Sequence, residues 1–99
     1  MAHRIAPEAE AELDDIWYYI AKESGSIEIA DRVIDSVTGR FFLLARFPQM
    51  GRRRDEDLRP GLRSLVVGEY VIIYRLEVEE VFILHVLRGS RDLKALFRH

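Results

Sequence analysis

The second half of the chain is rich in β-branched and aromatic residues, which two short breaks divide into three runs. The breaks are the pair Gly68-Glu69 and the acidic stretch 77–80. Runs of this composition separated by turn residues are typical of antiparallel strands joined by tight hairpins. The stretch from Leu62 to Asp92 therefore predicts a three-stranded antiparallel meander that ends on a basic turn.

Successive residues of a strand point to opposite sides of a sheet, so alternation predicts which side chains share a face. The sets expected to share a face within a strand are Arg63, Leu65 and Val67; Tyr70, Ile72 and Tyr74; and Val81, Ile83, His85 and Leu87. The alternating sets are Ser64 and Val66; Val71, Ile73 and Arg75; and Phe82, Leu84 and Val86. Both faces are apolar. We expect helices to cover one face and a ligand or a partner chain to cover the other.

The first half of the chain predicts a short strand from His3 to Ala6 followed by two helices. The first helix should begin at Pro7 and end near Ser24-Gly25, because proline suits the first helical turn and glycine suits a helix end. The second is expected from Ile27 to Phe47, before the segment 48–51. A short connection predicts an antiparallel helix hairpin packed on one face of the sheet. The expected fold is a single α+β domain spanning residues 1–99.

Composition narrows the classes of function. The chain has no cysteine, which excludes disulfides and cysteine-ligated zinc. The N-terminus lacks the apolar segment of a signal peptide and no apolar run reaches the length of a membrane span, so we expect a cytoplasmic protein without a membrane partner. Net charge is -2, which argues against a general nucleic-acid binder. Thirteen of the fifteen cations are arginine, and arginine favours recognition over proton transfer.

Several short motifs occur in a distinctive order along the chain. They are Ala6-Pro7-Glu-Ala-Glu-Ala-Glu-Leu-Asp-Asp-Ile16, Pro48-x-x-Gly51, Leu62-Arg63-Ser-Leu, Glu69-Tyr-Val-Ile-Ile-Tyr74 and Val86-Leu-Arg-Gly-Ser-Arg-Asp92. In this order the chain resembles the RelE/ParE superfamily of toxins from bacterial type II toxin-antitoxin modules, and it is most similar to the ParE branch. The resemblance implies a toxin that is held inactive, as a hetero-oligomer, by a ParD-like cognate antitoxin encoded in the adjacent gene. In the ParE branch the implied target is DNA gyrase, and in the RelE branch the implied activity is ribosome-dependent mRNA cleavage.

The choice between the branches depends on proton-transfer chemistry. RNA cleavage through the 2'-hydroxyl needs a base, an acid and cations that stabilise the phosphorane. The chain has no lysine between Lys22 and Lys94, and Leu87-Arg88-Gly89 stands where RelE-like enzymes carry a His-Tyr pair. Arg63 matches an arginine of the RNase branch but supplies charge alone. We therefore expect an inhibitor of DNA gyrase with no catalytic residues, metal or cofactor. A RelE-like mRNA interferase and a non-toxic homologue that acts as antitoxin partner and co-repressor are the alternatives.

Two groups of residues are the candidate binding sites. The residues expected to contact the target are Arg63, Arg88, Arg91 and Asp92. The residues expected to contact the antitoxin are Leu13, Trp17, Arg52, Arg53, Arg54 and Tyr74. A hydrophobic groove between the helix hairpin and the sheet is expected to receive the C-terminal segment of the antitoxin as a helix or an added strand.

Structural roles compete with these assignments. The arginines 52–54 are also explained as a solvated loop neutralised by the acids 55–57, which lack the geometry of a metal site. Arg63 is equally explained by an ion pair with an acid such as Glu69 or Asp92. His85 is expected as a hydrogen-bonded core or interface residue more than as a general base. Trp17 with Tyr18 and Tyr19 resembles an aromatic platform, but Trp17 falls on the apolar stripe of its helix, where the tyrosines are expected to cap it.

Overall fold

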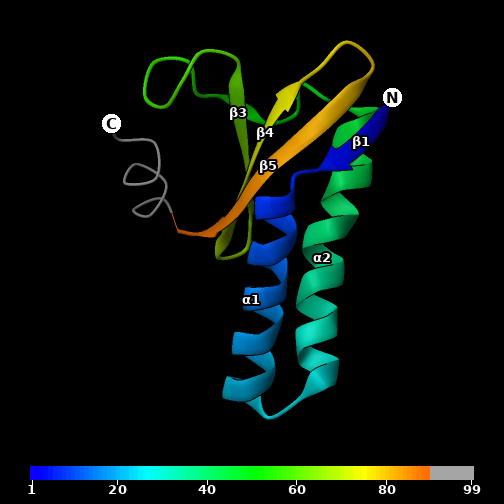
Figure 1. The fold of residues 1–99 in the computed structure, drawn as a ribbon, viewed down its shortest axis with the longest axis vertical. Helices are drawn as coiled ribbons and strands as arrows, with labels where there is room; N and C mark the ends of the chain where they lie inside the picture. Colours follow the sequence, from blue (N-terminus) through cyan, green and yellow to red (C-terminus); the bar gives the residue numbers. More distant parts are fainter. Residues whose placement is uncertain (90–99) are drawn as a thin grey trace.

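The computed structural model describes residues 1–89, which form two helices and a mixed sheet of five strands. In chain order the elements are β1 (Ala2–Ile5), α1 (Pro7–Ser24), α2 (Ile27–Arg46), β2 (Arg52–Arg53), β3 (Leu62–Val67), β4 (Tyr70–Leu76) and β5 (Glu80–Arg88). The strand order across the sheet is β1-β5-β4-β3-β2. The helices run side by side as an antiparallel hairpin, and their joined end extends beyond the sheet (Figure 1). The predicted α+β fold is confirmed.

Local sequence explains where the helices start and stop. Pro7 stands at the start of α1, and Gly25 ends it with a left-handed backbone (φ 69°) while its N–H donates to the carbonyl oxygen of Ala21. The hydroxyl of Ser26 then caps α2 by accepting a hydrogen bond of 3.2 Å from the backbone nitrogen of Ile29. A two-residue connection between such caps makes the helices antiparallel neighbours.

The sheet is wider than the predicted meander because each of its edges carries an additional strand. The N-terminal strand, Ala2–Ile5, starts and ends one residue earlier than predicted and pairs in parallel with β5. On the opposite edge, Arg52–Arg53 pairs antiparallel with β3, although the sequence predicts a loop for the arginines 52–54. Two residues give no period-2 pattern, so the sequence carries no signal for β2.

A β-bulge in β5 changes which side chains face the helices. Ile73 pairs with His85, but the next residue of β4, Tyr74, pairs with Ile83, so Leu84 is the extra residue. An extra residue shifts the alternation of all later side chains. Val81, Ile83 and Val86 consequently belong to the core beneath the helices, whereas Leu84 and Leu87 lie against the other core cluster. The prediction that Val81, Ile83, His85 and Leu87 share a face is therefore wrong, as is the one that groups Val86 with Phe82 and Leu84.

The two faces of the sheet carry cores of unequal size. The larger core fills the space between helices and sheet, and its buried residues are Ala9, Leu13, Val37, Phe41, Leu44, Val67, Tyr70, Ile72, Tyr74, Val81, Ile83 and Val86. The smaller core on the opposite face has Leu62, Val71 and Ile73 as its buried residues. Leu58 packs against them from the segment 52–61, which we call the arginine loop. Neither helix of the described chain is apolar enough over a sufficient length to cross a membrane.

Candidate protein-binding surfaces

Tyr74, expected to contact an antitoxin, instead joins the sheet to the turn that follows α2. Its side chain is 0% exposed. Its hydroxyl donates to the carbonyl oxygen of Pro48 at 2.9 Å and accepts from the backbone nitrogen of Gly51 at 2.8 Å. Burial raises the pKa of Tyr74 and keeps the hydroxyl protonated as a donor. This burial does not fit a direct contact between Tyr74 and a partner.

Arg63 serves the same turn from β3. Its Nη1 donates to the carbonyl oxygens of Gly51 at 2.8 Å and Gln49 at 3.3 Å. Of the two acids suggested by the sequence, Glu69 instead lies 3.7 Å from the Nη2 atom of Arg88, and Asp92 lies outside the described residues. Within residues 1–89, backbone carbonyls of the turn rather than a carboxylate therefore orient the guanidinium of Arg63. Its predicted contact with a target stays a prediction.

The three consecutive arginines of the loop differ in environment. Arg54 is 9% exposed, with Nε and Nη2 donating to the carboxylate of Asp57 at 2.6 to 3.0 Å and Nη1 donating to the hydroxyl of Ser64 at 3.0 Å. A fork-shaped guanidinium with these partners holds the loop against β3. Arg54 is thus a structural residue, and it presents little surface to a partner.

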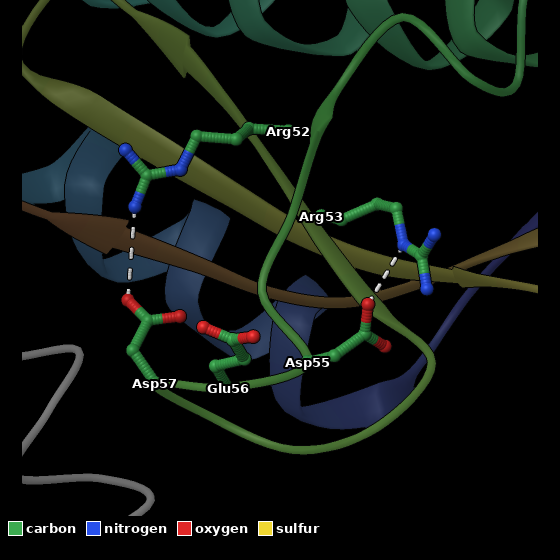
Figure 2. Close-up of a pocket in the computed structure, with 5 residues that line it drawn as sticks. All are labelled: Arg52, Arg53, Asp55, Glu56 and Asp57. Atoms are coloured by element: carbon green, nitrogen blue, oxygen red, sulfur yellow. Dashed lines mark hydrogen bonds and ion pairs between the residues drawn. The ribbon is translucent and has the colours of Figure 1, made fainter.

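Arg52 and Arg53 are exposed and line a hollow of about 590 Å³ with the acids that follow them. Figure 2 shows Arg52 pointing toward Asp57 (3.7 Å) and Arg53 toward Asp55 (2.7 Å). The pKa of Asp55 is lowered by a hydrogen bond from the backbone of Gly61 and then by Arg53. Hydrogen bonding to Arg54 lowers the pKa of Asp57. The arginines 52–54 therefore fit both the structural and the binding explanation. All three are paired with acids, as in a neutralised loop, yet Arg52 and Arg53 remain exposed and accessible to a partner.

A groove lies between α2 and the turn that joins β3 to β4. Its volume is about 380 Å³, and it is lined by Arg32, Val33, Ser36, Val37, Val67, Gly68, Glu69 and Tyr70. A second hollow of about 510 Å³ continues along the outer surface of α2, lined by Asp35, Ser36, Gly39, Arg40, Phe42, Leu43 and Arg46. Ser36 belongs to both. The expected groove between helices and sheet is present, with apolar side chains at its base and charges at its border.

The two α1 residues assigned to antitoxin contact lie elsewhere. Leu13 is buried in the core beneath the helices, and this burial does not fit a surface contact. The indole Nε1 of Trp17 donates to Asp31 of α2 at 2.8 Å, so Trp17 bridges the two helices at their surface. The predicted core position of Trp17 is wrong, because Trp17 does not belong to the core beneath the helices and its N–H bonds to Asp31 instead. Tyr18 and Tyr19 are exposed.

The end of β5 places Arg88 near residues from two other elements. Its Nη2 lies 3.7 Å from the carboxylate of Glu69, and its guanidinium lies 5.5 Å from the centre of the Tyr19 ring. The Tyr19 hydroxyl and then Glu69 raise the pKa of Arg88 further above its ordinary value. Arg91 and Asp92, the other residues expected at this tip, lie outside the described residues. The sequence did not indicate Tyr19 or Glu69 as neighbours of Arg88, because they are distant along the chain.

His85 is held by α1. Its Nδ1 lies 3.1 Å from a carboxylate oxygen of Glu12, and the same carboxylate accepts a hydrogen bond of 3.0 Å from the backbone nitrogen of Val86. Glu12 thus satisfies a backbone donor just after the bulge of β5. The interpretation of His85 as a hydrogen-bonded structural residue agrees with this contact. Within residues 1–89, no three His, Cys, Asp or Glu side chains are arranged to hold a metal ion.

Comparison with known proteins relates both the sequence and the fold of this chain to one family. A family model described as "ParE toxin of type II toxin-antitoxin system, parDE" matches residues 4–93. Toxin ParE1 of Caulobacter vibrioides is 36% identical over 93 residues, which cover 94% of both chains. Toxin ParE3 of the same organism is 36% identical over 84 residues, which cover 85% of this chain and 82% of the relative. In the solved structure of the chromosomal ParDE TA system from P. aeruginosa, one chain has the same fold, with a TM-score of 0.78 at 23% identity over 90% of this chain and 96% of that one. The chain belongs to the ParE toxin family of type II toxin-antitoxin systems.

Proposed function

We propose that this protein acts in the cytoplasm as an inhibitor of DNA gyrase and that a cognate antitoxin from the adjacent gene neutralises it. The observation that carries the proposal is the match of residues 4–93 to the ParE toxin family. The chain's composition is in keeping with it, since thirteen arginines and two lysines favour recognition over proton transfer. The contacts with gyrase are assigned to Arg88 at the end of β5 and to Arg91 and Asp92, which follow it.

The antitoxin is proposed to occupy the groove between α2 and the β3–β4 turn. Val33, Val37 and Val67 offer an apolar base, and Arg32 and Glu69 offer charges at the border. A groove of this kind suits an amphipathic segment that buries its apolar side chains and pairs its polar ones at the rim. The exposed Arg52 and Arg53 are a second place for an acidic stretch of the antitoxin, which would compete with Asp55 and Asp57 for these guanidinium groups.

We propose that inhibition needs no catalytic residue of this chain. Arg63, the residue shared with the RNase branch, has its Nη1 engaged by the carbonyl oxygens of Gln49 and Gly51. Cleavage of RNA would also require a base and an acid near it. The sequence provides no lysine between Lys22 and Lys94 for these roles.

Induction of the protein in a bacterial host tests the proposal. DNA synthesis and protein synthesis are followed by incorporation of labelled thymidine and labelled amino acids. We expect DNA synthesis to stop first, the purified protein to inhibit supercoiling by gyrase, and co-expression of the antitoxin to restore growth. Arrest of translation first, with codon-position cleavage of mRNA in primer-extension mapping, would establish the RNase alternative. Normal growth at full induction would favour the co-repressor alternative.

A further inference from the structure

The end of β5 carries an exposed aromatic and cationic surface assembled from three separate elements. Tyr19 comes from α1, Arg88 from β5 and Glu69 from the turn between β3 and β4. Tyr19 is 49% exposed, and the side chain of Arg88 is 53% exposed. About half of the Tyr19 residue and half of the Arg88 side chain are therefore accessible to a partner.

Arg88 is oriented on two sides. The ring of Tyr19 faces its guanidinium at 5.5 Å, within the range of a cation–π contact, and the carboxylate of Glu69 lies 3.7 Å away. The backbone beneath is also restrained, because the N–H of Gly89 donates to the carbonyl oxygen of Glu69 at 3.0 Å. A flexible arginine held in this way loses less conformational freedom when it binds a partner.

Tyr19 makes no contribution to the apolar stripe of α1. That stripe consists of Ala9, Leu13, Ile16 and Ile20, which pack in the core beneath the helices. Tyrosine and arginine are among the residue types that are enriched in the energetic centres of protein interfaces. Exposure, composition and orientation together indicate binding rather than packing.

We propose that Tyr19 and Arg88 form a single contact for the target, in which the Tyr19 ring positions the Arg88 guanidinium to pair with a carboxylate of the target protein. This inference rests on the proposed function and adds to it a positioning residue on α1 and the chemistry of the group that is recognised. A protein carboxylate fits better than a nucleic-acid backbone. Backbone binding to DNA uses several cations together, whereas the surface formed by Tyr19, Glu69 and Arg88 contains one cation.

The test is a double-mutant cycle on inhibition of gyrase supercoiling, with Tyr19→Leu, Arg88→Ala and the double variant. A cation–π contact that becomes desolvated in a complex predicts a rise of about 3- to 30-fold in the half-inhibitory concentration for Tyr19→Leu. Tyr19→Phe keeps the ring but removes the hydroxyl that also interacts with Arg88, so its half-inhibitory concentration should lie between those of the parent and Tyr19→Leu. Because Tyr19 acts through Arg88, the double variant should inhibit as poorly as Arg88→Ala alone. Independent, multiplying effects of the two substitutions would overturn the inference.

Three controls separate this role from a structural one. Tyr18→Leu changes the neighbouring exposed tyrosine and should inhibit like the parent. All variants should keep the melting temperature and antitoxin affinity of the parent. If Tyr19→Leu inhibits like the parent, the positioning role is wrong. Fluorescence anisotropy with duplex DNA alone should show no binding that depends on Arg88, and such binding would overturn the choice of a protein carboxylate.

Growth arrest distinguishes failure of the inference from failure of the proposed function. A parent protein that arrests growth without inhibiting gyrase overturns the gyrase assignment. The double-mutant cycle of Tyr19→Leu and Arg88→Ala is then measured by counting colonies after induction. Non-additive loss of arrest in that case supports the Tyr19–Arg88 contact with a different target. A parent that neither inhibits gyrase nor arrests growth overturns both.

Discussion

Gly51 and Tyr74 fit together because the hydroxyl of Tyr74 occupies the place where a side chain at position 51 would begin. The backbone nitrogen of Gly51 donates to that hydroxyl at 2.8 Å. A Cβ atom on Gly51 would collide with the Tyr74 ring and lie 2.8 Å from the carbonyl oxygen of Ser64. The turn after α2 is thereby fastened to the middle of the sheet, and α2 and the arginine loop are positioned on either side of it.

Replacement of Tyr74 by phenylalanine should destabilise the fold. The substitution leaves the buried N–H of Gly51 without its acceptor and removes the donor to Pro48, and an unsatisfied buried group costs about 1–3 kcal/mol. Urea unfolding followed by circular dichroism measures the change. Tyr18→Phe, at an exposed position, is the control and should lie within about 0.5 kcal/mol of the parent. Equal stability of both variants would show that the turn is held by other contacts.

Replacement of Glu12 by alanine should loosen the attachment of α1 to β5. The Glu12 carboxylate accepts from the backbone nitrogen of Val86 and contacts His85, so its removal should cost about 1–3 kcal/mol. Asp14→Ala removes the same charge from an exposed position of the same helix and should cost much less. Hydrogen exchange of the Val86 amide gives a local measurement. Unchanged protection of this amide in Glu12→Ala would contradict the prediction.

Arg53 and Arg54 should respond differently to substitution. Arg54→Ala breaks hydrogen bonds to Asp57 and to the buried Ser64, and loss of bonds to a charged group predicts a cost of about 2 kcal/mol. Arg53→Ala removes an exposed ion pair and should change stability by less than about 1 kcal/mol. Thermal melts of the two variants decide the matter. A larger loss of stability for Arg53→Ala than for Arg54→Ala would show that burial does not decide how much each arginine contributes to stability.

The acids of the loop should make stability depend on pH in the acid range. Hydrogen bonds from Gly61 and Arg54 lower the folded-state pKa of Asp55 and Asp57 below the ordinary value of 3.8. A lowered folded-state pKa stabilises the fold above the unfolded pKa, and this stabilisation is lost as pH falls through the folded pKa. The stability difference between the parent and Asp55→Asn/Asp57→Asn should therefore be constant at neutral pH and shrink below about pH 4. Urea titrations at pH 7, 5, 4 and 3 test it, and a difference that persists unchanged to pH 3 would count against it.

A large side chain at Ser36 should block the antitoxin without disturbing the toxin fold. Ser36 is exposed on α2 and lines both hollows of that surface, so Ser36→Arg should weaken antitoxin binding by tenfold or more, about 1.4 kcal/mol. Ala11→Arg adds the same side chain to an exposed position of α1 and is the matched control. Isothermal titration with the product of the adjacent gene measures both. Full affinity in Ser36→Arg would place the antitoxin elsewhere.

The regular elements and the family were predictable from the sequence because their signals are local. Pro7, Gly25 and Gly68 mark the start of a helix, the end of a helix and a hairpin turn, each through its own backbone preference. Alternation of apolar residues gave three strands of the sheet. The order of the short motifs then indicated a ParE-like toxin, and the family comparison confirmed it.

The faces of β5 were not predictable beyond the bulge. Period-2 alternation assumes that each residue opposes one partner, and Leu84 breaks this rule within an uninterrupted apolar run. No turn residue marks the place. The carboxylate that bonds the Val86 amide beyond the bulge belongs to Glu12, 74 residues away, so only the folded chain brings the two together.

The sequence by itself determined the helix hairpin, the meander and the family of this protein, but not the roles of its individual side chains. Arg52, Arg53 and Arg54 are identical neighbours in the chain, and only Arg54 is buried against Ser64 of β3. Tyr74 and Arg63 looked available for partners, and the tertiary structure uses both to hold the Gly51 turn. Secondary structure follows from backbone preferences that each residue carries with it, whereas burial and hydrogen-bond partners depend on residues that only folding brings into contact.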